Sequence, residues 1–190
     1  MRISTRQAEA IEIEVANMLR DYGIGSFPID VFDLCGRLGI GLVRYSDLQP
    51  EIAGLARSES SEGFSVCNGS FGCPKIVYND ARTTNRVRFT IAHEIGHLWL
   101  EHTEESPERE FQADYFAGYL LAPHPLLAQY GENHSSRETA RMFGISSSCL
   151  EIALDQLEQR RMRDASRRPH EWWLAEYCTL REGAAMSELR

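Results

Sequence analysis

The sequence predicts an α+β fold, on three observations about where its apolar residues fall. Helical spacing runs through the first 38 residues, short β-prone runs separated by turn residues occupy residues 40–79, and helical spacing returns after residue 80. The 190 residues are 43% hydrophobic and 25% charged, the ordinary mix of a folded chain that buries a core. We expect one domain over residues 1–125 and a helical extension over residues 126–190.

The first predicted helix spans residues 5–22. Its apolar residues recur at spacings that place them on one face, at Ala8, Ile11, Val15, Met18, Leu19 and Tyr22. A second helix is expected from Pro28 or Ile29 to Leu38, because proline suits a first helical turn and Gly39 suits a helix end. Both helices are predicted to have structural roles.

Four β-prone runs follow, separated by clusters of Gly, Ser, Asn and Pro. They cover residues 40–45, 52–57, 64–67 and 76–78. Short runs bounded by turn residues are typical of strands in a small sheet. We therefore predict a small, mainly antiparallel sheet after the two N-terminal helices.

Two further helices are expected after the sheet. The first covers residues 84–101 and has helical spacing at Val87, Ile91, Ile95 and Leu98. The second begins near Ser106 and Pro107, which suit a helix start, and ends before Pro123. Beyond it, residues 136–160 have a helix-turn-helix-like pattern in the predicted extension.

The first of these helices contains an HExxH motif. His93 and His97 are one turn apart, so both imidazoles can bind one cation from the same face. Glu94 lies about 100° round the helix axis from His93, where a carboxylate can take a proton from a water at the metal. Gly96 has no side chain and leaves room near the metal. On an exposed helix such residues are solvated charge, but the uncharged flanks predict a buried helix, where these groups need partners.

The next helix offers a third metal ligand. Glu110 and Asp114 are four residues apart and therefore lie on one face. A catalytic zinc needs three protein ligands and one open position. We predict that Glu110 is the third ligand and that Asp114 accepts the outer N–H of a ligating histidine. The alternative is an ordinary charged face, but the apolar run over residues 116–121 favours a largely buried helix.

Charge and cysteine content restrict the classes of function. The net charge of −8 has the wrong sign for a protein that binds nucleic acid over its whole surface. No apolar run is long enough for a bilayer span, and we expect neither a membrane anchor nor a secretory signal. The five cysteines include no CxxC pair and are expected to be free thiols in a reducing cytoplasm.

Three segments occur in a characteristic order. They are the β-prone run Lys75–Asn79, the motif segment Arg88–His97, and the helix Glu110-x-x-Ala113-Asp114-x-Phe116-Ala117-x-x-Leu120-Leu121-Ala122-Pro123. This order resembles the ImmA/IrrE family of bacterial metallo-endopeptidases over roughly residues 29–159. The last segment also resembles the third-ligand helix of thermolysin-like gluzincins. The chain departs from the family in having Ala122 where Met is usual and Glu101 where a histidine is common.

The resemblance implies a zincin-like domain and a zinc-dependent endopeptidase of the bacterial or phage cytoplasm. His93, His97 and Glu110 would hold one zinc ion per chain, with Glu94 as general base. An edge strand is expected to hold an extended substrate by main-chain hydrogen bonds, through Lys75, Ile76, Val77, Tyr78 and Asn79. Family members typically cleave a basic helix-turn-helix repressor, so we expect a DNA-binding protein as partner, attracted by the charge of −8.

Two other functions stay open. One is a non-proteolytic, zinc-containing regulatory module that binds a partner, as in a toxin–antitoxin pair. The other is DNA binding by the helix-turn-helix-like region, which is followed by a basic run at Arg160, Arg161, Arg163, Arg167 and Arg168. The would-be recognition helix over residues 146–158 carries three acidic residues and no Lys or Arg, which disfavours contact with phosphate. We therefore expect no direct nucleic-acid binding and no membrane contact.

Overall fold

The computed structural model describes residues 3–67, 72–104, 106–164 and 166–181. Its contacts divide the chain into two compact units. One unit contains Asp30–Ala117, and the other contains Ser4–Ile29 together with the described residues from Gly118 onward. None of the described helices is long and apolar enough to cross a membrane.

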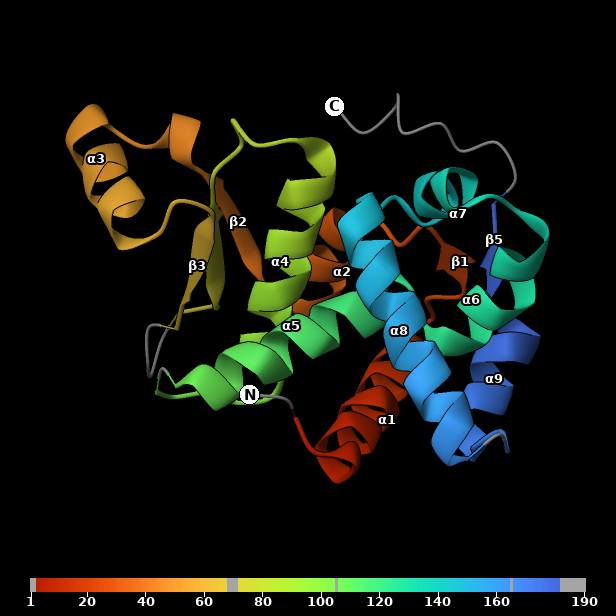
Figure 1. The fold of residues 1–190 in the computed structure, drawn as a ribbon. Helices are drawn as coiled ribbons and strands as arrows, with labels where there is room; N and C mark the ends of the chain where they lie inside the picture. Colours follow the sequence, from red (N-terminus) through yellow and green to blue (C-terminus); the bar gives the residue numbers. More distant parts are fainter. Residues whose placement is uncertain (1–2, 68–71, 105, 165, 182–190) are drawn as a thin grey trace. The chain divides into compact units, whose positions relative to one another are not determined.

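The first unit is built from a three-stranded sheet and the helices around it (Figure 1). Its elements are α2 (Val31–Leu38), β2 (Gly41–Arg44), the 3-10 helix η1 (Tyr45–Asp47), α3 (Pro50–Glu59), β3 (Gly63–Val66), β4 (Lys75–Tyr78), α4 (Thr84–Trp99) and the first part of α5 (Pro107–Leu121). The Asp30 side chain accepts hydrogen bonds from the backbone N–H groups of Phe32 and Asp33, and this cap starts α2 later than the predicted Pro28. Gly39, with φ 69°, ends α2 as predicted.

The sheet has the strand order β2-β4-β3. Strand β2 runs parallel to β4, with Gly41 opposite Lys75, and β3 runs antiparallel to β4, with Val66 opposite Lys75. The sheet therefore contains one parallel and one antiparallel pair among the described residues, where the sequence predicts a mainly antiparallel one. A parallel pair requires a long connection, and here α3 and β3 lie between the two parallel strands in the chain.

Residues 52–57, predicted as a strand, lie within helix α3, so this prediction is wrong. Pro50 occupies the first turn of α3, where a proline favours a helix start. Ala56 is buried beside Tyr45, whereas Ile52 is 51% exposed. A short run that contains apolar residues does not by itself distinguish a strand from one or two helical turns.

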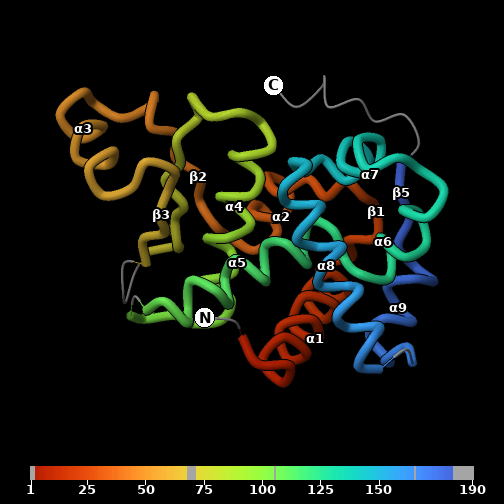
Figure 2. Tube along the Cα trace, viewed as in Figure 1, coloured from red at the N-terminus to blue at the C-terminus, as the bar shows by residue number. Residues whose placement is uncertain are grey.

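Among its described residues, the second unit contains helices and one short pair of parallel strands. Figure 2 follows the path of the chain through these elements. The elements of this unit are α1 (Thr5–Asp21), β1 (Ser26–Phe27), the end of α5, α6 (His124–Tyr130), the 3-10 helix η2 (Gly131–Asn133), α7 (Ser136–Phe143), α8 (Ser147–Arg163), α9 (Pro169–Tyr177) and β5 (Thr179–Leu180). Helix α9 packs against α1 and α6, and α6 also contacts α8. Gly144, with φ 63°, ends α7 and Ser146 caps α8, in agreement with the helix-turn-helix-like pattern.

The N-terminal helix α1 belongs to the second unit. Val15, Met18 and Leu19 are fully buried, which confirms the predicted apolar face. The expected division places this helix with residues 1–125, whereas the contacts group it with α9. Apolar spacing shows which face of a helix is buried but not which partner covers it. A functional division between residues 1–125 and 126–190 stays a prediction.

Charged side chains lie in the interior of the second unit. Glu12 on α1 is 2% exposed and lies 3.5 Å from both Arg168 and His170. Glu171 on α9 accepts hydrogen bonds from the Arg160 side chain of α8 (3.0 Å) and from the Arg168 backbone N–H (2.7 Å). Buried ions require such pairing, because an uncompensated charge in the interior is strongly destabilising. The cluster therefore links α1, α8 and α9.

We expect acid to destabilise the second unit through His124, which is 2% exposed. Burial lowers the His124 pKa from 6.5 to about 4, although the charge of Glu12 opposes this. As pH falls from 6.5 to about 4, the unfolded chain binds a proton that the folded chain does not, so the free energy of unfolding falls by roughly 3 kcal/mol. Denaturant unfolding at pH 7 and pH 4 measures this change. The difference in the free energy of unfolding between pH 7 and pH 4 should be smaller in His124→Gln and unchanged in His134→Gln. If it is unchanged in His124→Gln, His124 is not the group responsible.

Candidate metal centre

Helix α4 carries the HExxH motif and lies beside β3 and β4 (Figure 1). Its apolar residues Val87, Ile91 and Ile95 are buried, as their spacing predicts. His93 and His97 lie one turn apart, and their side chains are 16% and 15% exposed. The helix is thus fixed by its apolar face, while both imidazoles stay accessible to an ion.

Helix α5 brings two carboxylates to the same place. Glu110 and Asp114 lie one turn apart on α5, and both contact His93. Gly96 permits this close approach of α5 to α4, because a Cβ there would lie 3.0–3.2 Å from the side chain of the buried Phe116. We predict from the sequence that Gly96 leaves room near the metal; in the structure the side chain of Phe116 occupies this space.

The side chains of three residues, His93, His97 and Glu110, bring potential ligand atoms close together, and we call this group of three residues the ligand triangle. His93 Nε2 and His97 Nε2 are 3.0 Å apart, and the two Glu110 oxygens lie 3.4 Å from His93 Nε2 and 3.3 Å from His97 Nε2. Bonds of about 2.0–2.1 Å to a tetrahedral zinc place neighbouring ligand atoms about 3.3–3.4 Å apart. The triangle is therefore the right size for one such ion, and it contains the three residues predicted as ligands.

Asp114 binds the outer nitrogen of His93. Nδ1 of His93 lies 2.9 Å from Asp114 Oδ1, so Nδ1–H donates to the carboxylate and the Nε2 lone pair points into the ligand triangle. Burial lowers the His93 pKa, but the hydrogen bond and charge of Asp114, together with the charges of Glu94 and Glu110, raise it overall. Carboxylates around a ligand histidine also increase the attraction of the site for a cation.

Glu94 lies beside the ligand triangle but is not part of it. Its carboxylate is 7% exposed and accepts hydrogen bonds from the hydroxyl and the backbone N–H of Ser65 on β3. Burial raises the pKa of Glu94, and the hydrogen bonds from Ser65 oppose this rise. A carboxylate with a raised pKa can take a proton from water and release it again near neutral pH. The position is consistent with the predicted role as general base.

His102 makes contacts that the sequence does not predict. Its Nδ1 lies 3.2 Å from His97 Nδ1, and its Nε2 lies 3.0 Å from Gln112 Oε1. Burial lowers the pKa of His102. Burial, with the charges of His93 and His102, also lowers the pKa of His97 to about 4. His102 lies beyond the end of α4, where helical spacing no longer indicates which way a side chain points, so periodicity offers no signal for this contact.

The ligand triangle lies in a cleft of about 790 Å³ in the first unit, which Glu94, His102 and Asp114 also line. Strand β3, helix α4, the end of α3 and the start of α5 contribute to its walls. Its described lining includes one arginine, Arg86, and six acidic residues: Glu59, Glu62, Glu94, Glu104, Glu110 and Asp114. Glu62 is paired with Arg82 (3.0 Å) and Arg86 (2.7 Å), whereas Glu104 is 83% exposed. The cleft is therefore acidic and accessible.

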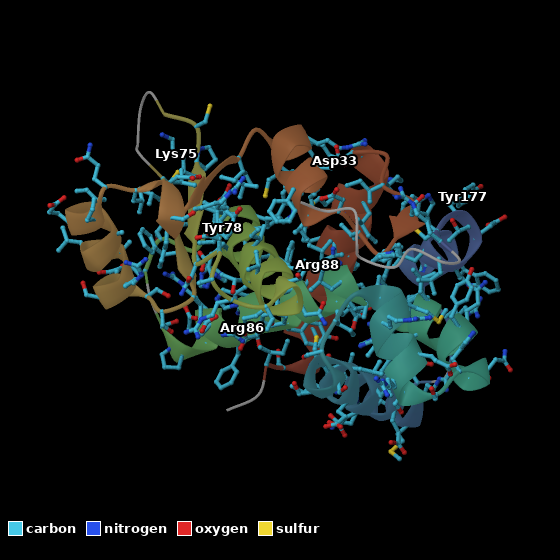
Figure 3. The ribbon with its side chains drawn as sticks, turned by 90° about the horizontal axis from the view of Figure 1, so that it is seen from above. Asp33, Lys75, Tyr78, Arg86, Arg88 and Tyr177 are labelled. Atoms are coloured by element: carbon cyan, nitrogen blue, oxygen red, sulfur yellow. The ribbon has the colours of Figure 1, made fainter. Side chains whose placement is uncertain are left out.

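The segment predicted to hold the substrate is not an edge strand, so this prediction is wrong. Strand β4 is central, with β2 on one side and β3 on the other, and its backbone is paired on both sides. Figure 3 labels its two ends, Lys75 and Tyr78; Ile76, Val77 and Tyr78 are buried, and the backbone N–H of Asn79 donates to the segment before β3. Strand order depends on contacts between distant segments, which local patterns do not encode.

Residues 36–155 match the Peptidase M78 family, whose domain is described as IrrE N-terminal-like. The match covers more than half of the chain and includes the motif on α4 and both carboxylates on α5. The chain belongs to the Peptidase M78 family. A comparison with curated proteins gives no match. The resemblance to the ImmA/IrrE family inferred from the sequence is confirmed, and so is the α+β zincin-like fold class.

Membership of the M78 family indicates a peptidase, an enzyme that hydrolyses peptide bonds. The ligand triangle is the possible metal site of this peptidase domain. The match begins within α2 and ends within α8, so it includes parts of both structural units.

A second group of potential ligands lies in the second unit of this M78 peptidase, at Glu12, His170 and Glu171. Their ligand atoms lie within 4.8 Å of one another. The two carboxylates already contact Arg168 and Arg160, so a metal ion here would lie next to two guanidinium charges. We therefore interpret this group as a salt-bridge cluster and not as a metal site.

We expect Gly63→Ala to disturb the M78 site from the side of β3. A Cβ at residue 63 would lie 2.7 Å from Thr90 Cγ2 and 3.0 Å from the backbone oxygen of Val77. Overpacking of this kind costs about 1–3 kcal/mol, and it would push β3 away from α4. The control is Gly54→Ala in α3, where nothing lies within 4 Å and helix propensity favours alanine by up to about 1 kcal/mol. Denaturant unfolding measures both variants, and equal stabilities would contradict this packing.

Proposed function

We propose that this chain is a zinc-dependent endopeptidase that hydrolyses a peptide bond in one specific cytoplasmic protein. The main support for this proposal is the ligand triangle of His93, His97 and Glu110, with the buried Glu94 carboxylate beside it. Two imidazoles and one carboxylate leave the fourth position of a tetrahedral ion open, as in catalytic zinc sites and unlike closed structural ones. We propose one zinc ion per chain.

The side chains around the triangle have distinct roles in this proposal. When bound, zinc supplies Lewis acidity, which polarises the scissile carbonyl and increases the acidity of water. Glu94 accepts a proton from the attacking water and donates it to the leaving amine. Ser65 orients the Glu94 carboxylate through two hydrogen bonds, and Asp114 orients the His93 ring.

The open edge of β3 is the proposed binding site for the substrate backbone. Among the described residues β3 pairs on one side only, with β4, and Gly63, Phe64 and Ser65 line the cleft. An extended peptide can add to such an edge through main-chain hydrogen bonds. Because Glu94 contacts Ser65 of the same strand, a peptide bond held along β3 lies near the general base. The substrate must be extended there, which favours a linker or a locally unfolded segment over a packed domain.

The charge of the cleft supports a basic substrate. Its described lining carries six acidic residues and one arginine, and the whole chain has a net charge of −8. Opposite charges accelerate association between two proteins, and salt weakens this effect. A repressor must be basic enough to bind DNA. We therefore propose a helix-turn-helix repressor as the substrate class.

Arginines in the last turn of α8 and in the segment after it make contacts within the second unit, which supports the proposal that the chain does not bind nucleic acid directly. Arg160 is 7% exposed and binds Glu171. Arg168 lies 3.3 Å from Glu9. Arginines that are paired with carboxylates contribute less to phosphate binding than free ones, because the pair must first be broken.

Incubation of the zinc-loaded enzyme with the product of each neighbouring regulator gene tests the substrate class. We expect cleavage of one basic DNA-binding protein, little cleavage of casein, and slower cleavage at high salt. Broad cleavage of casein, or equal rates at low and high salt, would contradict the substrate proposal and leave the zinc chemistry in place. A partner that binds tightly but is never cleaved would favour the non-proteolytic regulatory module.

A further inference from the structure

His102 connects one ligand histidine to helix α5. His97 directs Nε2 into the ligand triangle, 3.3 Å from the nearer Glu110 oxygen, and directs Nδ1 toward His102. On its other side, His102 Nε2 lies 3.0 Å from Gln112 Oε1. The three side chains therefore form a continuous chain of hydrogen-bonding atoms that ends at the ligand triangle. We call Gln112, His102 and His97 the amide relay.

The chemistry of these atoms determines where each proton lies. An amide oxygen only accepts hydrogen bonds, so Gln112 Oε1 requires a proton on His102 Nε2. In a neutral ring the other nitrogen then carries a lone pair, so His102 Nδ1 accepts from His97 Nδ1–H. With its proton on Nδ1, His97 directs the Nε2 lone pair into the ligand triangle, where it faces the Nε2 lone pair of His93 at 3.0 Å. Two lone pairs that converge in this way suit two ligands of one cation.

We infer that Gln112 and His102 are positioning residues that hold His97 in the tautomer required of a metal ligand. The opposite orientation of the Gln112 amide would give the opposite tautomer. If the amide nitrogen of Gln112 faced His102, the relay would place the proton of His97 on Nε2, and this ring could not bind a metal. Asp114 performs the same task for His93 directly, through a carboxylate 2.9 Å from Nδ1. Helix α5 thus sets the tautomers of both ligand histidines.

The end of α4 places His102 against His97. After Leu100, Glu101 adopts a left-handed conformation with φ 54°. The backbone N–H groups of Glu101 and His102 then donate to the carbonyl oxygens of Leu98 (3.3 Å) and His97 (3.0 Å). This is the Schellman arrangement of a helix end, which usually contains glycine at the left-handed position. The turn folds the chain back, so that His102 faces the outer nitrogen of His97.

The inference rests on the proposed metal site, so its test begins with metal-free protein. Long-range proton–nitrogen NMR at pH 8 reports which ring nitrogen of each histidine carries the proton, and His97→Gln assigns the His97 signals. We expect the Nδ1–H tautomer of His97 in the unsubstituted protein and in Gln112→Glu, which keeps an acceptor oxygen. In Gln112→Met, which has a similar length but no acceptor for N–H, we expect a mixture of the two tautomers.

Zinc affinity provides the second measurement. Loss of an outer partner of a metal-binding histidine weakens metal binding about 10–100-fold, and we expect this for His102→Phe. Gln112→Met should weaken zinc binding less, because Gln112 acts on His97 through His102. We expect Gln112→Glu to keep the affinity of the unsubstituted protein. His134→Phe is the matched control, because it removes an exposed histidine that is not part of the amide relay and whose Nδ1 lies 2.7 Å from the Tyr130 backbone oxygen.

Either measurement can overturn the inference. An Nε2–H tautomer of His97 in the unsubstituted metal-free protein would contradict it. So would an unchanged tautomer and unchanged zinc affinity in Gln112→Met and His102→Phe. Failure of the unsubstituted protein to bind zinc would instead contradict the proposed function, and the NMR result for the metal-free protein would still decide whether the relay exists.

Discussion

Substitution of Glu94 by glutamine is expected to abolish peptide hydrolysis and to leave the metal content unchanged. The carboxylate lies beside the ligand triangle and is not one of its atoms, so its loss removes no ligand. Glutamine has a similar shape but cannot accept a proton from water. General base catalysis contributes about 10²–10⁴-fold to a rate, so we expect a fall of at least this size. The measurement is the initial rate of cleavage of the identified substrate at saturating zinc.

The control for this experiment is Glu151→Gln, the same chemical change at an exposed position on α8. We expect this variant to retain full activity. Activity in Glu94→Gln within a few-fold of the unsubstituted enzyme would exclude Glu94 as the base. Loss of zinc from Glu94→Gln would instead make this residue a ligand, which the structure does not support.

Alanine substitution at His93, His97 or Glu110 is expected to remove the metal. Each change leaves two of the three protein ligands, and a two-ligand site does not retain catalytic zinc. Asp114→Ala should have a smaller effect, because Asp114 contacts the outer nitrogen of His93. We expect about 10–100-fold weaker zinc binding in Asp114→Ala, with full occupancy restored at high zinc. Elemental analysis after equilibrium dialysis measures both classes of variant.

The number of zinc ions bound per chain shows whether the ligand triangle alone binds metal or whether Glu12, His170 and Glu171 also do. One zinc ion per chain, lost in the three alanine variants, would support the ligand triangle as the only site. Unchanged zinc content in Glu110→Ala would place the third ligand elsewhere. Two zinc ions per chain would contradict our interpretation of Glu12, His170 and Glu171 as a salt-bridge cluster.

Those parts of the site that lie on a single helix could be predicted from the sequence. The geometry of His93, Glu94 and His97 follows from the helical repeat, and the same repeat places Glu110 and Asp114 on one face. In the structure these two sets meet at distances of 2.9–3.4 Å. Residue spacing predicts which side chains share a face of α4 and which share a face of α5. The contact between these two groups of side chains depends on the packing of α5 against α4, which the spacing does not predict.

Features that depend on contacts between distant segments could not be predicted in this way. The strand Lys75–Tyr78 is short and apolar, and nothing in its pattern shows that β2 and β3 cover both of its edges. Residues 52–57 form a helix because Pro50 starts one and Ala56 packs beside Tyr45. His102 reaches His97 through a left-handed turn at Glu101, a conformation that a glutamate rarely adopts.

X-ray absorption at the zinc edge, on protein loaded with one equivalent of zinc, identifies the atoms that bind the metal and so tests the ligand triangle as the metal site. We expect a first shell of nitrogen and oxygen at about 2.0–2.1 Å, with the scattering of two imidazole rings and no sulfur. One imidazole should disappear from the spectrum of any zinc that His97→Ala retains. A sulfur atom at about 2.3 Å would instead assign the zinc to cysteine, with the exposed Cys67 and Cys73 as the first candidates. That result would contradict the ligand triangle as the metal site.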